Sequence, residues 1–244
     1  MARKNTNEEL WLEVSAAGIY RDAATPGSGL LTVLAAAGQA DLVLDTGEGA
    51  AFSVGEVVRV SSGNLAEFGT VEAIAVETLT LNSFLAFSHA IGIAVEAQDE
   101  IDLGAVSDDG ITRETTVERT EIRAVTQATA YANLVASVAQ RITWNLLNHS
   151  LENVLIALGM DESAIHGAGT QADPFVADLT ADNMEELLNQ CIWFRGALKD
   201  ATTFEIQGWA VEWDANQTLT YLRGQAVLLP MAADVQHIRY LTPL

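Results

Sequence analysis

Side chains that could act as nucleophiles or metal ligands are few and scattered in this sequence of 244 residues. The single cysteine, Cys191, precedes Ile192, Trp193 and Phe194, so we expect a buried and unreactive thiol. The four histidines have none of the spacings of metal sites, and we expect each of them at a turn or on the surface. The sequence therefore predicts no catalytic residue, no cofactor-binding residue and no metal ligand.

Carboxylates offer the other possible chemistry. Four aspartates come closest to a cluster: Asp99, Asp102, Asp108 and Asp109. They lack the alternating ligand spacing and the closing glutamate of a calcium loop, so ordinary turn chemistry explains them. Glu205 and Glu212 are a pair that could serve paired-carboxylate hydrolysis. A hydrolase or a carbohydrate-binding module therefore stays open as an alternative function.

Long β-strands must position these residues. A short strand at 101–104 leads to a turn at Ser107–Gly110, to a polar strand at Thr112–Arg123, and then to a strand at Ala132–Leu146 with two alternating faces. The last strand would extend about 50 Å, far beyond the usual length of about five or six residues. We therefore expect it to bend, to carry a bulge or to reach beyond its own subunit.

One short helix follows the long strand. Ser150 can cap its first turn, and Gly159 can end it. Between them, an apolar stripe at helical spacing predicts packing on a sheet and consists of Leu151, Val154, Leu155 and Leu158.

The C-terminal third completes the predicted sheet. A short helix is expected at 181–190, followed by strands at 191–199 and 203–213, with a bend near Gly208. A turn at 214–217 leads to a returning strand at 218–229, which Pro230 should stop.

Residues 42–98 have the pattern of a small inserted β domain. Short strands are expected at 52–60, 69–74, 77–81 and 89–96, separated by Gly and Asn, as in a small barrel. We expect these strands to close on themselves and to lean on the main domain or on a neighbouring subunit. The fold class is therefore mainly β, with residues 1–41 as an N-terminal arm and first strand and residues 99–244 as the main domain.

Four segments of the main domain resemble a known family. They are Ile101–Gly104, the turn at Asp108–Gly110, the strand end Thr120–Arg123, and the strand-to-helix junction Trp144–Asn153. Together they resemble the tail tube (major tail) proteins of long-tailed bacteriophages, over residues 99–244. The resemblance implies a β-sandwich with a flanking helix, which assembles into hexameric rings that stack into a hollow tube for DNA.

The resemblance also carries expectations about partners and location. The partners are other copies of the chain and tail proteins such as the tape measure, terminator and baseplate proteins, with no cofactor, no membrane and no enzymatic activity. The protein would be assembled in the host cytoplasm and reside in the virion tail. Another virion role, in capsid decoration or in the baseplate, is the first alternative.

Net charge agrees with a channel that does not hold DNA. The chain has 33 acidic and 12 basic residues, a formal charge of −21, so we expect no tight binding to a phosphate backbone. Acidic or neutral walls would let DNA pass without sticking, although solubility or adaptation to high salt explains the acidity equally well.

One segment is predicted to join successive rings. The small and polar residues between the two long strands suit a loop that orders against a partner. The residues expected to make the inter-ring contact are Arg123, Val125, Gln127, Thr129 and Tyr131.

Overall fold

The computed structural model describes residues 12–23, 26–61, 65–122, 132–148, 150–157, 165–166, 170, 176–177, 190–198, 203–214 and 228–241. These residues form a mainly β protein with a single α-helix, which confirms the predicted class. The elements are β1 (Leu12–Asp22), β2 (Ser28–Leu30), β3 (Asp41–Val43), η1 (Glu48–Ala51), β4 (Val57–Val60), β5 (Glu67–Ala75), β6 (Thr78–Leu81), β7 (Ala94–Ile122), β8 (Ala132–Leu146), α1 (Leu151–Ala157), β9 (Ile165–His166), β10 (Val176–Ala177), β11 (Cys191–Leu198), β12 (Thr203–Trp213) and β13 (Leu229–Leu241).

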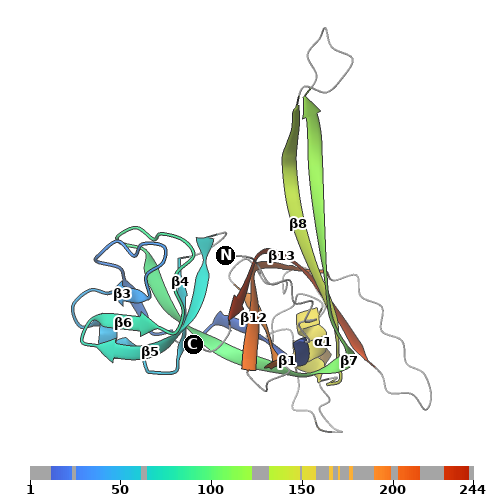
Figure 1. The fold of residues 1–244 in the computed structure, drawn as a ribbon. Helices are drawn as coiled ribbons and strands as arrows, with labels where there is room; N and C mark the ends of the chain where they lie inside the picture. The colour runs from blue at the N-terminus through green and yellow to red at the C-terminus, as the bar shows by residue number, and fades with distance from the viewer. Residues whose placement is uncertain are drawn as a thin grey trace.

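Six strands close into a ring, which we call the barrel (Figure 1). β1 pairs with β11, β11 with β12, β12 with β13, β13 with β8, β8 with β7, and β7 returns to β1, always antiparallel. Each of the six strands contributes buried side chains to one apolar core, for example Ile19, Leu103, Trp144, Phe194, Ile206 and Met231. The pairings of these six strands close one sheet on itself and do not by themselves show the two facing sheets of the predicted sandwich.

Helix α1 is capped and anchored as its sequence predicts. The backbone N–H of Asn153 donates to Oγ of Ser150 at 3.0 Å, which confirms the predicted cap. Leu155 and Ile156 are buried, and Ile156 belongs to the barrel core. The side chain of Asn153 donates to the carbonyl oxygen of Leu103 at 2.8 Å. Because Leu103 lies at a shift in the β1–β7 register, this bulge directs a backbone acceptor toward the helix.

β7 is continuous through residues 107–110, so the predicted turn there is wrong. The pairing with β8 shifts instead between Val106 and Ile111, and Gly110 has a positive φ of 70°. Residues that often form turns make a bulge here, because β8 pairs with β7 on both sides of them. The bulge lies near the point where β7 and β8 leave the barrel.

Pro230 does not stop a strand, contrary to the prediction, because it lies inside β13. It pairs with Asn145 of β8, whereas β12 joins β13 only from Ala233 onward. Proline is tolerated at this position because the opposite side of β13 has no described strand partner there.

Other C-terminal predictions have mixed outcomes. β11 and β12 match the predicted strands closely. Ile206 and Val211 would point to opposite faces of a regular strand, yet both belong to the barrel core. A bend near Gly208, as predicted, accounts for this change of face. Leu158, Gly159, and residues 181–189 and 215–227 lie outside the described residues.

A smaller body, which we call the lobe, is formed by β2 to β6 and the start of β7 (Figure 1). Its separate apolar core includes Leu31, Leu42, Val58, Leu79 and Val95, and thus begins before the predicted boundary at residue 42. The lobe strands do not close on themselves, contrary to the prediction. β4 pairs with residues 95–98 of β7, which then continues into the barrel.

The lobe covers one outer face of the barrel. On β11, Ile192 and Phe194 enter the barrel core, whereas Cys191 and Trp193 join a third cluster with Phe68 of the lobe. Both faces of this strand are therefore buried, which explains why four successive residues are apolar. The lobe thus leans on the main domain, as predicted.

Closure of the barrel requires glycine at position 18. A Cβ atom there would overlap the indole of Trp193 and the carbonyl oxygen of Ile101. We predict that Gly18→Ala lowers the free energy of unfolding by about 3 kcal/mol, because tightly packed sites do not accept added volume. Urea unfolding measures this loss, with Glu13→Ala on an exposed part of β1 as the control. Equal stability of the two variants would show that the closure is not tightly packed.

Candidate functional site

The β7–β8 hairpin projects from the barrel as a two-stranded arm (Figure 1). Its pairing continues to Ile122 with Ala132. β13 accompanies β8 only as far as Gln140, and β1 accompanies β7 only as far as Ala105. Past Thr115, the partner of Gln140, the arm extends about 23 Å with no described strand along either outer edge.

An exposed apolar pair lies on this arm. Val117 pairs with Val138, and the two residues are 44% and 54% exposed. A lone two-stranded ribbon is only marginally stable in water, and its outer backbone edges are templates for another chain. The arm therefore has the properties of an assembly element that is completed by a partner.

The residues predicted to contact the next ring lie outside the described residues. Arg123, Val125, Gln127, Thr129 and Tyr131 fall between the end of β7 and the start of β8. The inter-ring contact stays a prediction.

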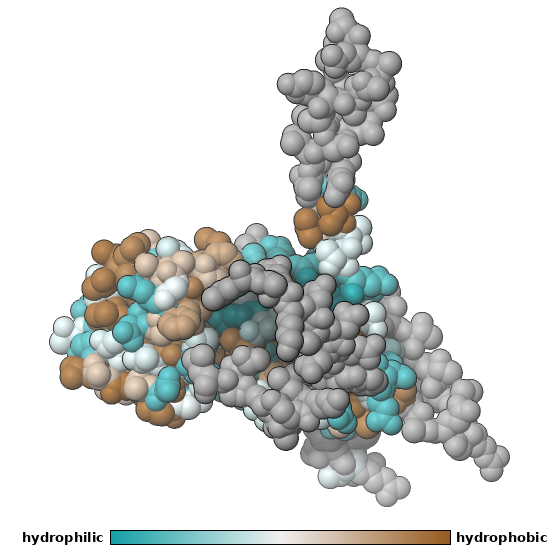
Figure 2. Space-filling model, viewed as in Figure 1, coloured by the Kyte–Doolittle hydropathy of each residue, from teal (hydrophilic) through white to brown (hydrophobic). Residues whose placement is uncertain are grey.

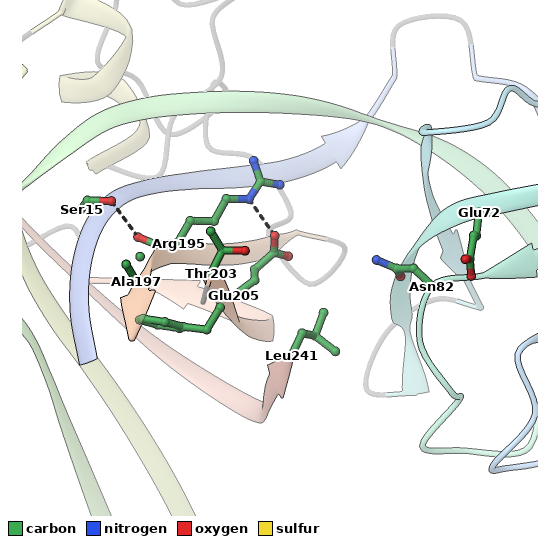
Figure 3. Close-up of a pocket in the computed structure, with 10 residues that line it drawn as sticks. Ser15, Glu72, Asn82, Arg195, Ala197, Thr203, Glu205 and Leu241 are labelled. Carbon is green, nitrogen blue, oxygen red and sulfur yellow. Dashed lines mark hydrogen bonds and ion pairs between the residues drawn. The ribbon is translucent and has the colours of Figure 1, made fainter. Parts of the chain in front are cut away.

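A cleft of about 640 Å³ lies between the barrel and the lobe (Figure 3). Arg195 and Glu205 come from the barrel side, and Glu72 and Asn82 face them from the lobe. The remaining lining residues are small or apolar and come from the barrel: Ser15, Gly196, Ala197, Thr203, Phe204 and Leu241.

The charged groups on the barrel side of the cleft, Arg195 and Glu205, are paired with each other. Nε of Arg195 donates to Glu205 at 2.7 Å, and Nη1 pairs with Glu100. Burial disfavours the charged form of Arg195, but the hydrogen bonds to Glu100 and Glu205 outweigh it and raise the pKa of the guanidinium. Glu205 also accepts from Tyr20 at 3.2 Å and from Gln207 at 2.6 Å. These groups brace the barrel wall rather than offering a free acid or base.

The predicted carboxylate pair is not brought together. Glu205 lines the cleft, but Glu212 lies seven residues farther along the same strand, about 23 Å away if the strand is extended. Glycosidase carboxylates stand within about 10 Å of each other. Within the described ranges, no group of three or more His, Cys, Asp or Glu side chains could hold a metal ion.

A buried ionic cluster joins the lobe to the barrel. The Glu67 side chain is 1% exposed and accepts hydrogen bonds from the backbone N–H groups of Ala86 and Phe87, both at 2.7 Å. Nε2 of His89 lies 3.0 Å from Glu67, and Nη1 of Arg239 on β13 lies 3.8 Å away. The prediction that His89 is a turn or surface residue is therefore wrong, because its side chain is buried.

Arg239 completes this cluster, which we call the latch. It donates to the backbone oxygen of Phe68 and to Gln207 at 2.6 Å, and its guanidinium lies 5.5 Å from the ring centroid of Trp209. No spacing in the sequence distinguishes Glu67 from the other acidic residues, because its partners come from distant segments. The latch fixes the lobe on the barrel and has no free reactive group.

We predict that Glu67→Gln lowers the free energy of unfolding by about 3 kcal/mol, since one amide oxygen cannot replace two carboxylate oxygens beside a buried Arg239. Burial raises the pKa of Glu67, but hydrogen bonds from His89, Ala86 and Phe87 outweigh it and hold the pKa below its usual 4.5. The ionised carboxylate thus stabilises the fold above pH 4.5, and this contribution disappears as the pH falls through the lower folded pKa. Urea unfolding between pH 3 and 7 should show that the free energy of unfolding falls less on acidification in the variant than in the original protein. Identical pH profiles would contradict the latch.

Cys191 is fully buried, as predicted, and burial raises the pKa of its thiol well above the usual value. We predict that a thiol reagent at pH 8 labels the native protein at least about a thousandfold more slowly than the unfolded chain, because reaction requires opening of the fold. Stoichiometric labelling of native protein within seconds would contradict this placement.

Two further observations bear on function. In the described part of the chain, no helix is long and apolar enough to cross a membrane. No model of a known protein family matches the sequence, and no curated protein matches it.

Proposed function

We propose that this chain is a structural subunit of a phage tail tube, which assembles into closed rings, six copies in each, that stack around a channel for DNA. The projecting β7–β8 hairpin carries the proposal. No described strand pairs with either outer edge of this hairpin beyond Thr115, and its Val117–Val138 pair is exposed. A subunit on its own gains little from such an arm.

Neighbouring copies supply the missing partners in this proposal. Hairpins from successive subunits lie side by side, so that each outer edge pairs with the edge of the next copy and a continuous inner barrel forms. Closure of the ring removes every exposed edge, as closure does in single-chain barrels. Because each copy then contacts two different surfaces, the interface is heterologous and suits a cyclic ring.

The finer family features follow from the same proposal. In this proposal, the barrel with α1 packed on it takes the place of the tail-tube sandwich and its flanking helix, and the lobe is an added domain. The charge of −21 supports a channel from which DNA is repelled rather than held. Tape measure, terminator and baseplate proteins would bind the assembled tube, which is made in the host cytoplasm and resides in the virion tail.

A shortened hairpin tests this function. Thr116 pairs with Ala139, so an Asn-Gly turn can replace residues 117–138 without disturbing the barrel. We predict that the full chain forms rings with a central hole in negative stain, whereas the shortened chain keeps its stability within about 1 kcal/mol and stays monomeric by mass photometry.

A second deletion is the matched control. Removal of residues 125–130 leaves most of the arm and should permit rings but prevent their stacking. If the full chain stayed monomeric at every salt and protein concentration, the proposal would fail. Small oligomers without a channel would favour the decoration or baseplate alternative.

A further inference from the structure

Exposed apolar side chains are concentrated on the lobe. Twelve large apolar residues of the described chain are strongly exposed, and eight of them belong to the lobe. Figure 2 shows these apolar surfaces gathered over the lobe at the left of the molecule. The lobe has its own buried apolar core, and the eight exposed residues lie outside it. Patches of this kind mark surfaces that contact another molecule.

Four of these residues form one patch, which we call the lobe patch: Leu30, Val33, Leu34 and Ile91. They are 48%, 51%, 54% and 66% exposed, in that order. Backbone hydrogen bonds fix the two segments side by side. Gly92 donates to the carbonyl oxygen of Leu31 at 2.7 Å, and Ala35 and His89 donate to each other's carbonyl oxygens at 3.0 and 2.8 Å.

The lobe patch lies on two uncharged segments of a strongly acidic chain. Residues 28–40 and 78–95 contain no Asp, Glu, Lys or Arg, although the whole chain carries a net charge of −21. Two copies of such a chain repel each other wherever their carboxylates approach. The two segments of the lobe patch therefore bring no carboxylate of their own to a contact with a second copy, and the carboxylate of Glu48 beside Leu30 accepts from the backbone N–H of Leu30 at 2.7 Å.

The same chain presents a second apolar site, the exposed Val117–Val138 pair on the hairpin, where Val117 is followed by one acidic and one basic residue, Glu118 and Arg119. The hairpin projects away from the lobe of its own molecule (Figure 1), so the two sites do not meet within one subunit. Two different apolar sites on one chain that do not meet are what a heterologous contact between copies requires.

We propose that the lobe patch binds the hairpin of a neighbouring copy, with Val117 and Val138 packed against Leu34 and Ile91. This inference rests on the proposed ring assembly and gives the lobe a role in it. The lobe then receives the hairpin of the next subunit and braces it while the hairpin edges pair. Because the latch holds the lobe rigidly on the barrel, this contact also sets the angle between successive subunits.

Cross-linking between two single-cysteine variants tests the contact. Copies with Ile91→Cys are co-expressed with copies with Val138→Cys and treated with a short bis-maleimide reagent. Cys191 contributes no background because it is fully buried. The expected result is a covalent dimer whose linked peptides span positions 91 and 138, identified by mass spectrometry.

Val54→Cys is the matched control for Ile91→Cys. Val54 is 65% exposed and lies just before the end of β4 that pairs with Gln98. Ile91 lies beyond the opposite end of β4, near Ala94. The two residues are therefore equally exposed but lie at opposite ends of this strand pairing. We expect the Val54→Cys copies to give at least about tenfold less dimer with Val138→Cys copies. Equal yields from both pairs, or no dimer from either, would overturn the inference. Rings seen by microscopy without the 91–138 link would overturn it while leaving the proposed function intact.

Discussion

The single strand β7 is the constraint on which the rest of the structure depends. Its first residues pair with β4 in the lobe, residues 98–105 pair with β1 to close the barrel, and the remainder pairs with β8 in the hairpin. A strand is stiff along its length, so three bodies built on one strand cannot move independently without breaking a ladder of hydrogen bonds. The bulges at Leu103 and at residues 107–110 set the directions in which these bodies point.

Side-chain interactions reinforce this arrangement at the interface of lobe and barrel. Tyr20 of the barrel and Phe68 of the lobe stack with ring centroids 6.3 Å apart, and within the barrel Arg195 lies 4.1 Å from the ring centroid of Trp193 on the same strand. The latch around Glu67 adds charged hydrogen bonds that are sheltered from water. The lobe and barrel therefore form one rigid base, and the hairpin is the part that extends from this base toward a partner.

Much of the fold could be predicted from patterns within the sequence. The alternation at Ala132–Leu146 and at Thr203–Trp213 gave the bounds of β8 and β12, and Ser150 gave the start of α1. Long-range pairing could not be predicted this way. Nothing local shows that β7 passes from lobe to barrel, that Gly110 lies in a bulge, or that Glu67 meets Arg239. The lobe patch was missed because Leu30 to Leu34 resembles a core segment until its exposure is known.

Hydrogen exchange of the hairpin amides tests the central claim most directly. The claim is that the outer edges of β7 and β8 are completed by neighbouring copies. Amides in residues 111–118 and 138–140 should exchange more slowly in assembled protein than in dilute monomer, while those of β12 in the barrel wall should exchange at the same rate in both. Hairpin amides that exchange equally fast in assembled and monomeric protein would contradict the account.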